Sequence, residues 1–120
     1  MNLEELEKTL ISKNSSQKEF PFNDDVMVFK VMNKMFALLL WKEKPLKINL
    51  KCLPFDALAY REIYDCVDAG YHMNKKHWNT ITIDGTMRDE ILIGMIDESY
   101  NLVVDKLTKK EKEKLLNDKR

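Results

Sequence analysis

Residues 70–85 read Gly-Tyr-His-Met-Asn-Lys-Lys-His-Trp-Asn-Thr-Ile-Thr-Ile-Asp-Gly and contain the clearest strand of the chain. Within residues 78–83, one tryptophan and two threonines alternate with one asparagine and two isoleucines, which is the period of two that a half-buried strand requires. Asp84-Gly85 then predicts a turn. Histidines, lysines and aromatic residues crowd the approach to this strand, so the stretch is also the first candidate for a binding site.

The segments on either side of this stretch predict an α+β protein. Alternating or β-branched runs predict strands, and apolar residues at helical spacing predict helices. A single domain over residues 1–120 is expected, with an antiparallel sheet of about five to six strands packed with helices. The predicted strands are 20–22 (at a sheet edge), 27–31, 35–41, 46–51 and 78–83, and the predicted helices are 3–13, 54–67, 87–106 and 108–117.

Two of the predicted helices carry further local signals. Pro54 suits the first turn of the helix over 54–67, whose expected inward residues are Phe55, Leu58, Tyr64 and Val67. The longest helix has Thr86 and Asp89 at capping-box spacing, and Thr108 with Glu111 predicts a second box. The buried stripe expected for the longest helix is Ile91, Leu92, Met95, Ile96, Ser99, Tyr100, Val103 and Leu107.

Composition places the chain among globular proteins. Apolar residues make up 44% and charged residues 33% of the sequence. The N-terminus lacks the features of a secretory signal, and the longest apolar run, residues 35–41, is too short to span a membrane. Cys52 and Cys66 form no Cys-x-x-Cys pair. We therefore expect a cytoplasmic protein with reduced cysteines and no membrane association.

The formal net charge is zero, but the charges are segregated along the chain. Residues 26–52 contain six lysines and one acid, whereas residues 89–105 contain five acids and no base. Basic tracts coincide with predicted strands and acidic tracts with predicted helices. If the strands share one sheet, the surface is polarised.

Five blocks of the sequence are similar to one known family. They are Phe29-Lys30-Val31, Lys34-Met35-Phe36-Ala37, Leu50-Lys51-Cys52, the run from Gly70 to Trp78, and Ser99-Tyr100. In order and spacing the chain resembles the MmcQ/YjbR family of small bacterial proteins. The resemblance implies a CyaY-like α+β fold and a DNA-binding role. It also implies a likeness to the double-wing domain of a phage transcription factor, which binds DNA through hairpins of its sheet.

The residues themselves offer a physical route to nucleic acid. Lysines at alternate positions of a strand are spaced so that they can meet several backbone phosphates. Asn49, Thr80 and Thr82 could add hydrogen bonds to sugar and phosphate, and an aromatic ring could stack on an unpaired base. The expected contact residues are Lys30, Lys34, Lys47, Lys51, Tyr71, Asn74, Lys75, Lys76 and Trp78.

Each of these residues also has a purely structural interpretation. The lysines could solvate an exposed face or protect a sheet edge. Trp78 and Tyr71 could belong to the core or its rim, and Asn74 with His72 could hold the loop through bonds to the backbone.

Catalytic and metal sites are disfavoured by the sequence. His72 and His77 do not match any zinc-site spacing with the two cysteines, and Cys52 ends an apolar strand. Three glycines leave no phosphate-binding loop. We expect no enzymatic activity and no cofactor. The alternative to DNA binding is a protein-interaction module that docks a partner on the sheet face or on the acidic helix over 89–105.

Overall fold

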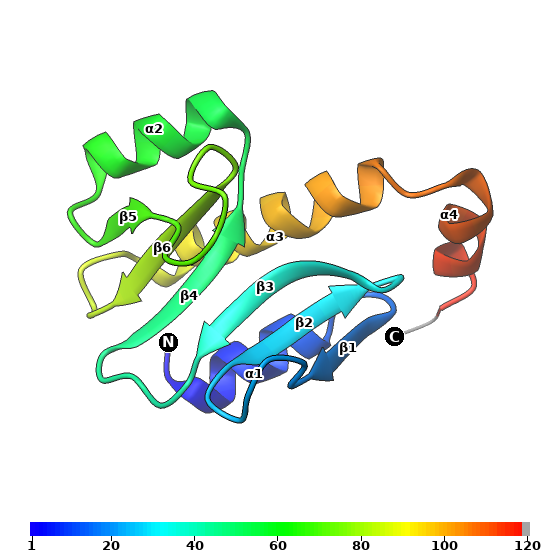
Figure 1. The fold of residues 1–120 in the computed structure, drawn as a ribbon, viewed down its shortest axis with the longest axis horizontal. Helices are drawn as coiled ribbons and strands as arrows, with labels where there is room; N and C mark the ends of the chain where they lie inside the picture. Colours follow the sequence, from blue (N-terminus) through cyan, green and yellow to red (C-terminus); the bar gives the residue numbers. More distant parts are fainter. Residues whose placement is uncertain (119–120) are drawn as a thin grey trace.

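The computed structural model describes residues 1–118, and within that range it contains one six-stranded sheet and four α-helices (Figure 1). The helices are α1 (Leu3–Ile11), α2 (Pro54–Ile63), α3 (Asp89–Asp105) and α4 (Lys109–Leu116). The strands are β1 (Ser16–Glu19), β2 (Met27–Val31), β3 (Lys34–Leu40), β4 (Leu46–Lys51), β5 (Val67–Ala69) and β6 (Trp78–Ile83). The predicted α+β class is confirmed.

All neighbouring strands are antiparallel, in the order β1-β2-β3-β4-β6-β5. The first four strands follow chain order. After β4 the chain passes through α2 and returns as β5 at the sheet edge, so β6 enters between β4 and β5. The strand predicted over residues 78–83, which is β6, therefore lies inside the sheet.

Helices α1 and α3 pack on one face of the sheet, which we call the inner face (Figure 1). The strands supply the most deeply buried side chains, and the predicted stripe of α3 covers them. Burial of these apolar surfaces is the main source of stability. The fully buried strand residues include Phe29, Phe36, Leu39, Ile48 and Ile81, and the buried residues of α3 are Leu92, Met95, Ile96, Ser99 and Val103.

A β-bulge shapes the centre of the inner face. The register between β2 and β3 shifts at Phe29 and Lys30, so that Phe36 is the extra residue of β3. The ladder between β3 and β4 ends at Ala37, which leaves the Phe36 carbonyl and the Lys51 N–H without strand partners. The Ser99 hydroxyl of α3 donates to the Phe36 oxygen at 2.6 Å and accepts from the Lys51 nitrogen at 2.8 Å. One buried serine thus satisfies the backbone where two strands separate.

Two predictions about local structure are wrong. The segment 20–22 is not a strand; the edge strand is β1, just before it, and Pro21 follows its end because proline cannot continue the ladder. The helix predicted over 54–67 ends at Ile63, and Val67 instead begins β5.

Of the two predicted capping boxes, one forms and the other does not. Thr108 and Glu111 form the predicted capping box of α4. Thr86 does not cap α3, because its hydroxyl and its N–H both donate to the Asp84 carboxylate in the preceding turn. Helix α3 begins later, after Arg88, without a side-chain cap.

Among the described residues, no helix combines the length and the apolar character needed to cross a membrane. Both cysteines are buried and free.

Candidate nucleic-acid interface

The face of the sheet opposite α1 and α3, which we call the outer face, carries most of the predicted contact residues. Residues directly opposite each other on antiparallel strands point to the same face. Lys47 of β4 stands opposite Thr82 of β6, and Lys51 stands opposite Trp78. Lys30 reaches the same face from β2, opposite Met35.

The loop of residues 70–77 folds back over this face. The Tyr71 N–H donates to the Thr80 hydroxyl at 2.9 Å, and Asn49 Nδ2 donates to the Tyr71 carbonyl at 3.4 Å. The Thr80 hydroxyl in turn donates to Asn49 Oδ1. Asn49 and Thr80 are therefore buried, and their expected role as donors to sugar and phosphate is wrong: they anchor the loop.

Gly70 permits the close return of this loop. Its N–H donates to the Trp78 carbonyl at 2.9 Å. A Cβ atom at position 70 would lie 2.8 Å from Trp78 Cβ and 2.9 Å from the Trp78 oxygen, which is closer than real Cβ contacts allow. Only glycine fits here without a backbone shift.

Arg61 of α2 supports the loop from beneath, a role that sequence reasoning missed. Its Nε donates to Asn79 Oδ1 at 2.7 Å, and its Nη2 donates to the carbonyl oxygens of Lys75 and Trp78. Asn79 Nδ2 donates onward to the Ala57 carbonyl at 3.1 Å. The signal in the sequence was a lone base, Arg61, in an otherwise acidic segment, which could have indicated an internal rather than a solvent-facing role.

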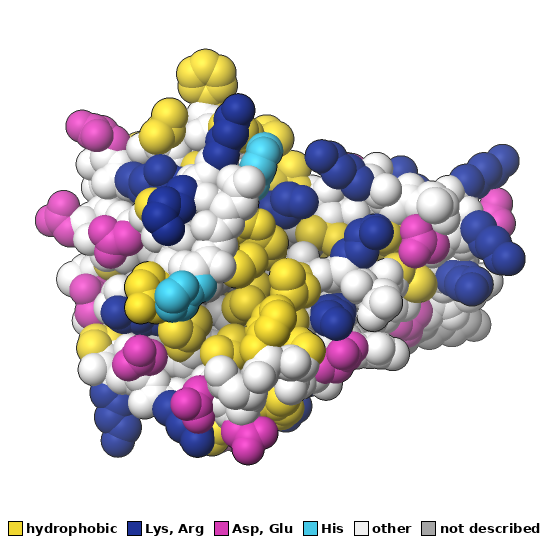
Figure 2. Space-filling view, viewed as in Figure 1, with side chains coloured by type: hydrophobic (Ala, Val, Ile, Leu, Met, Phe, Trp, Pro, Cys, Tyr) yellow, Lys and Arg dark blue, Asp and Glu magenta, His cyan; other side chains and the backbone are white. Residues whose placement is uncertain are grey.

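An apolar strip runs along the outer face beside the loop. It consists of Val28, Leu38 and Trp78, with Met35 and Met73 packed against them. Figure 2 shows apolar side chains exposed down the middle of this face, with basic side chains and both histidines around them. Trp78 is only 8% exposed, so it serves as part of this strip and not as a free stacking ring.

Two of the predicted lysines are less available than expected. Lys30 forms an ion pair with Glu19 at 3.3 Å. Lys34 stands opposite Val31, a core residue, so it points to the inner-face side. The bulge at Phe36 reverses the alternation of β3 and turns Lys34 away from the other lysines.

Four predicted lysines remain, half-buried on the outer face of β4 or exposed in the loop of residues 70–77. Lys47 and Lys51 come from β4, and Lys75 and Lys76 come from the covering loop. Within residues 1–118, none of the four forms an ion pair with a carboxylate. Lys75 Nζ donates to the Gly70 carbonyl at 3.1 Å.

The remaining predicted residues lie in the loop. Tyr71 is 62% exposed, and its ring centroid lies 4.0 Å from that of His72. Asn74 holds the loop, as its structural interpretation expected: its side chain accepts from the Lys76 N–H at 2.9 Å and its carbonyl accepts from the N–H groups of His77 and Trp78. Tyr71 and Asn74 are both exposed.

A small polar cluster lies where α2 meets α3. The Tyr60 hydroxyl donates to Glu98 Oε2 at 2.8 Å, and Cys52 lies close by. Burial, followed by the nearby Glu98 charge, raises the pKa of the Cys52 thiol to about 11. Burial also raises the pKa of Glu98. A protonated, buried thiol is a poor nucleophile, which favours a structural role for Cys52.

The described residues contain no group of three or more histidine, cysteine or acidic side chains arranged to hold a metal ion.

Most acidic side chains of helix α3, the other proposed docking surface, already have partners within the protein. Asp97 pairs with Lys13 and Glu98 with Tyr60, while Asp89 pairs with the N-terminal amine at 3.1 Å.

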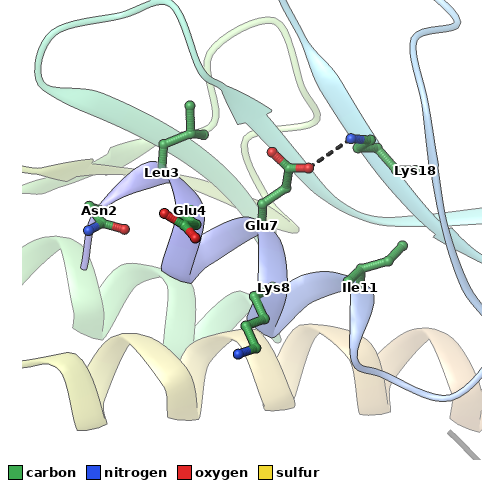
Figure 3. A pocket seen from close by; sticks show the side chains of 7 residues that line it. All are labelled: Asn2, Leu3, Glu4, Glu7, Lys8, Ile11 and Lys18. Atoms are coloured by element: carbon green, nitrogen blue, oxygen red, sulfur yellow. Dashed lines mark hydrogen bonds and ion pairs between the residues drawn. The ribbon is translucent and has the colours of Figure 1, made fainter.

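An open groove of about 720 Å³ runs along α1, away from these residues (Figure 3). Glu7 and Lys18 form an ion pair across it at 2.7 Å, between α1 and β1. Leu3 and Ile11 supply its apolar lining. The groove holds no cluster of cations and is not continuous with the predicted contact set.

Comparison with known proteins identifies the family. A family model described as YjbR matches residues 11–102. The chain is 36% identical to Escherichia coli O157:H7 YbdF over 96 residues, covering 80% of this chain and 79% of that protein. It is 29% identical to Escherichia coli K12 YjbR over 116 residues, covering 97% and 98%.

Solved structures agree with this match. The Deinococcus radiodurans protein DR2400, with a DUF419 domain, superposes with a TM-score of 0.89 at 37% identity, covering 95% of this chain and 87% of that one. A Pseudomonas syringae protein gives a TM-score of 0.74 at 26% identity, covering 85% and 98%. The chain therefore belongs to the YjbR family.

Proposed function

We propose that the protein binds DNA through the outer face of its sheet, mainly by contacts to phosphates. The proposal is supported by two half-buried lysines on the outer face of β4, Lys47 and Lys51, and two exposed lysines in the loop of residues 70–77, Lys75 and Lys76, none with a carboxylate partner among residues 1–118. Cations left without a carboxylate partner can displace the counterions condensed on a nucleic acid.

The spacing of the lysines fits this role. Lys47 and Lys51 are four residues apart on β4, which corresponds to about 13 Å along a strand. A basic strand and a basic loop side by side can follow a phosphate backbone over more than one repeat. Such contacts position a protein on DNA without reading base sequence.

The same face gives little support for reading base edges. Helices α1 and α3 pack against the inner face of the sheet, so neither presents a free surface beside these lysines (Figure 1). The exposed Tyr71 ring and the apolar strip are suited to contact sugars or an unpaired base. We therefore expect the protein to bind DNA of any sequence and not to require fully paired duplex.

The test is a fluorescence-anisotropy titration with a labelled random duplex and with one of its strands. K47A/K51A and K75A/K76A should each weaken binding of both probes. The matched control is K109A/K110A on α4, which removes the same charge from a different part of the molecule and should change affinity much less. Equal loss of affinity in all three variants would show that net charge alone, and not the outer face, governs binding.

A further inference from the structure

Helix α2 presents apolar side chains to solvent. Phe55 is 88% exposed, Leu58 60% and Ile63 66%, and Leu53 just before the helix is 52% exposed. We call these four residues the α2 row. The expectation that Phe55 and Leu58 face inward is therefore wrong, although Tyr64 does pack against the core.

The buried side of α2 is instead held largely by polar contacts. Ala57 is 1% exposed and its carbonyl accepts from Asn79 Nδ2. The Tyr60 hydroxyl donates to Glu98, and Arg61 donates to Asn79. These bonds fix the rotation of the helix about its axis, so the α2 row cannot turn inward without breaking them. The row contributes little to the core and is presented on a rigid support.

The spacing of the row fits a helical partner. Phe55 and Leu58 are three residues apart, and Ile63 is eight residues from Phe55, so all three lie on the exposed half of the helix, with Glu62 between Leu58 and Ile63. Side chains at such spacing form the ridges that pack into the grooves of another helix. In Figure 2, apolar side chains project at the top edge, where Figure 1 places α2.

The charges beside the row indicate which sign of charge a partner should carry. Glu62 and Asp65 are exposed at the C-terminal end of α2. Arg61, the one base between residues 53 and 70, is engaged beneath the helix. Two copies of α2 packed together would therefore leave these acids without a matching cation, whereas a basic partner would supply one.

We propose that the α2 row docks an amphipathic helix of another protein, with lysine or arginine beside its apolar stripe. Such packing of one helix against another uses apolar anchors for affinity and flanking charges for choice of partner. The α2 row includes none of the lysines of the outer face, and the proposal does not depend on DNA binding.

The probe is a labelled helix-forming peptide of about 16 residues with leucines at positions i, i+3, i+4 and i+7 and flanking lysines. Its twin carries glutamates in place of the lysines. The full-length protein should bind the lysine peptide at least about tenfold more tightly than the glutamate peptide. Equal binding of the two peptides would overturn the proposed choice of partner.

Variants locate the site. F55S/L58S should abolish binding while leaving the circular dichroism spectrum and the melting temperature unchanged, because both side chains are exposed. E62K/D65K should reverse the preference between the peptides. The control is L116S, which changes an 82% exposed leucine on α4 and should bind as the wild type does.

Two results would contradict the proposal. Full binding by F55S/L58S would place the peptide elsewhere. A wild-type dimer in analytical ultracentrifugation that becomes monomeric in F55S/L58S would show that a second copy of the chain covers the row.

Discussion

Replacing Ser99 by alanine should destabilise the fold strongly although it removes only one oxygen atom. Ser99 is fully buried, and its hydroxyl bridges the Phe36 carbonyl and the Lys51 N–H at 2.6 and 2.8 Å. The variant leaves both backbone groups without a partner at the place where β3 and β4 separate.

The expected loss follows from the cost of unsatisfied buried groups. Each such group costs about 1–3 kcal/mol, so two give a loss of about 2–4 kcal/mol when partial relaxation is allowed for. The total free energy of unfolding of a domain of this kind is about 5–15 kcal/mol. The melting temperature should fall by roughly 8–16 °C.

Urea unfolding followed by circular dichroism measures this loss directly. S99C should show a smaller loss than S99A because a thiol is a weak donor and acceptor. The control is N101A on the exposed side of α3, which should change stability by less than about 0.5 kcal/mol. A loss for S99A no larger than that for N101A would refute the role assigned to Ser99.

Three further predictions concern the loop and the cluster beneath it. G70A should destabilise the protein by about 1–3 kcal/mol and change the fluorescence of Trp78, because the new Cβ would lie 2.8 Å from Trp78 Cβ; unchanged urea unfolding and emission would contradict this. In a C66A background at pH 8, Cys52 should react with a disulfide reagent about a hundredfold more slowly than an ordinary thiol, since its pKa is about 11; a rate typical of free cysteine would contradict this. The raised pKa of Glu98 means that the folded protein holds this proton more tightly than the unfolded chain does. The contribution of Glu98 to the free energy of unfolding is therefore fully present below its ordinary pKa and is lost as pH rises through the raised pKa. The free energy of unfolding of E98Q should accordingly rise relative to that of the wild type between pH 4 and pH 7. A difference between the two proteins that does not change with pH would contradict this.

The sequence predicted those strands and helices whose apolar residues recur at the spacing of a strand or a helix and are in fact the buried ones. The alternation in 78–83 and 46–51 and the stripe of α3 led directly to their strands and helix. It did not predict β1, whose Ser-Gln-Lys-Glu sequence carries no strand propensity and is held at the edge by pairing with β2.

The side of helix α2 that was predicted to face the core, with Phe55 and Leu58, faces solvent instead. Periodicity shows that a helix has an apolar side, but hydrogen bonds decide whether that side is the one covered. In α2, Arg61 and Tyr60 bind partners beneath the helix and leave Phe55 and Leu58 outside. Such partners lie far away in the sequence, on β6 and α3.

The candidate site was predicted in part. Alternation placed Lys47 and Lys51 on one face of β4, and the structure keeps them there. It could not place Lys34, because the bulge at Phe36 reverses the alternation of β3. It also assigned Asn49 to the surface, whereas the loop of residues 70–77 covers it.

The dependence of DNA affinity on salt tests the proposed interface most directly. If four or five phosphates are neutralised, the logarithm of the association constant should fall with the logarithm of salt concentration with a slope of about −3 to −5. Removing Lys47 and Lys51 together should make that slope shallower by about 1.8. A slope for K47A/K51A equal to that of the wild type, or wild-type binding that does not respond to salt, would contradict the assignment of the outer face as the nucleic-acid interface.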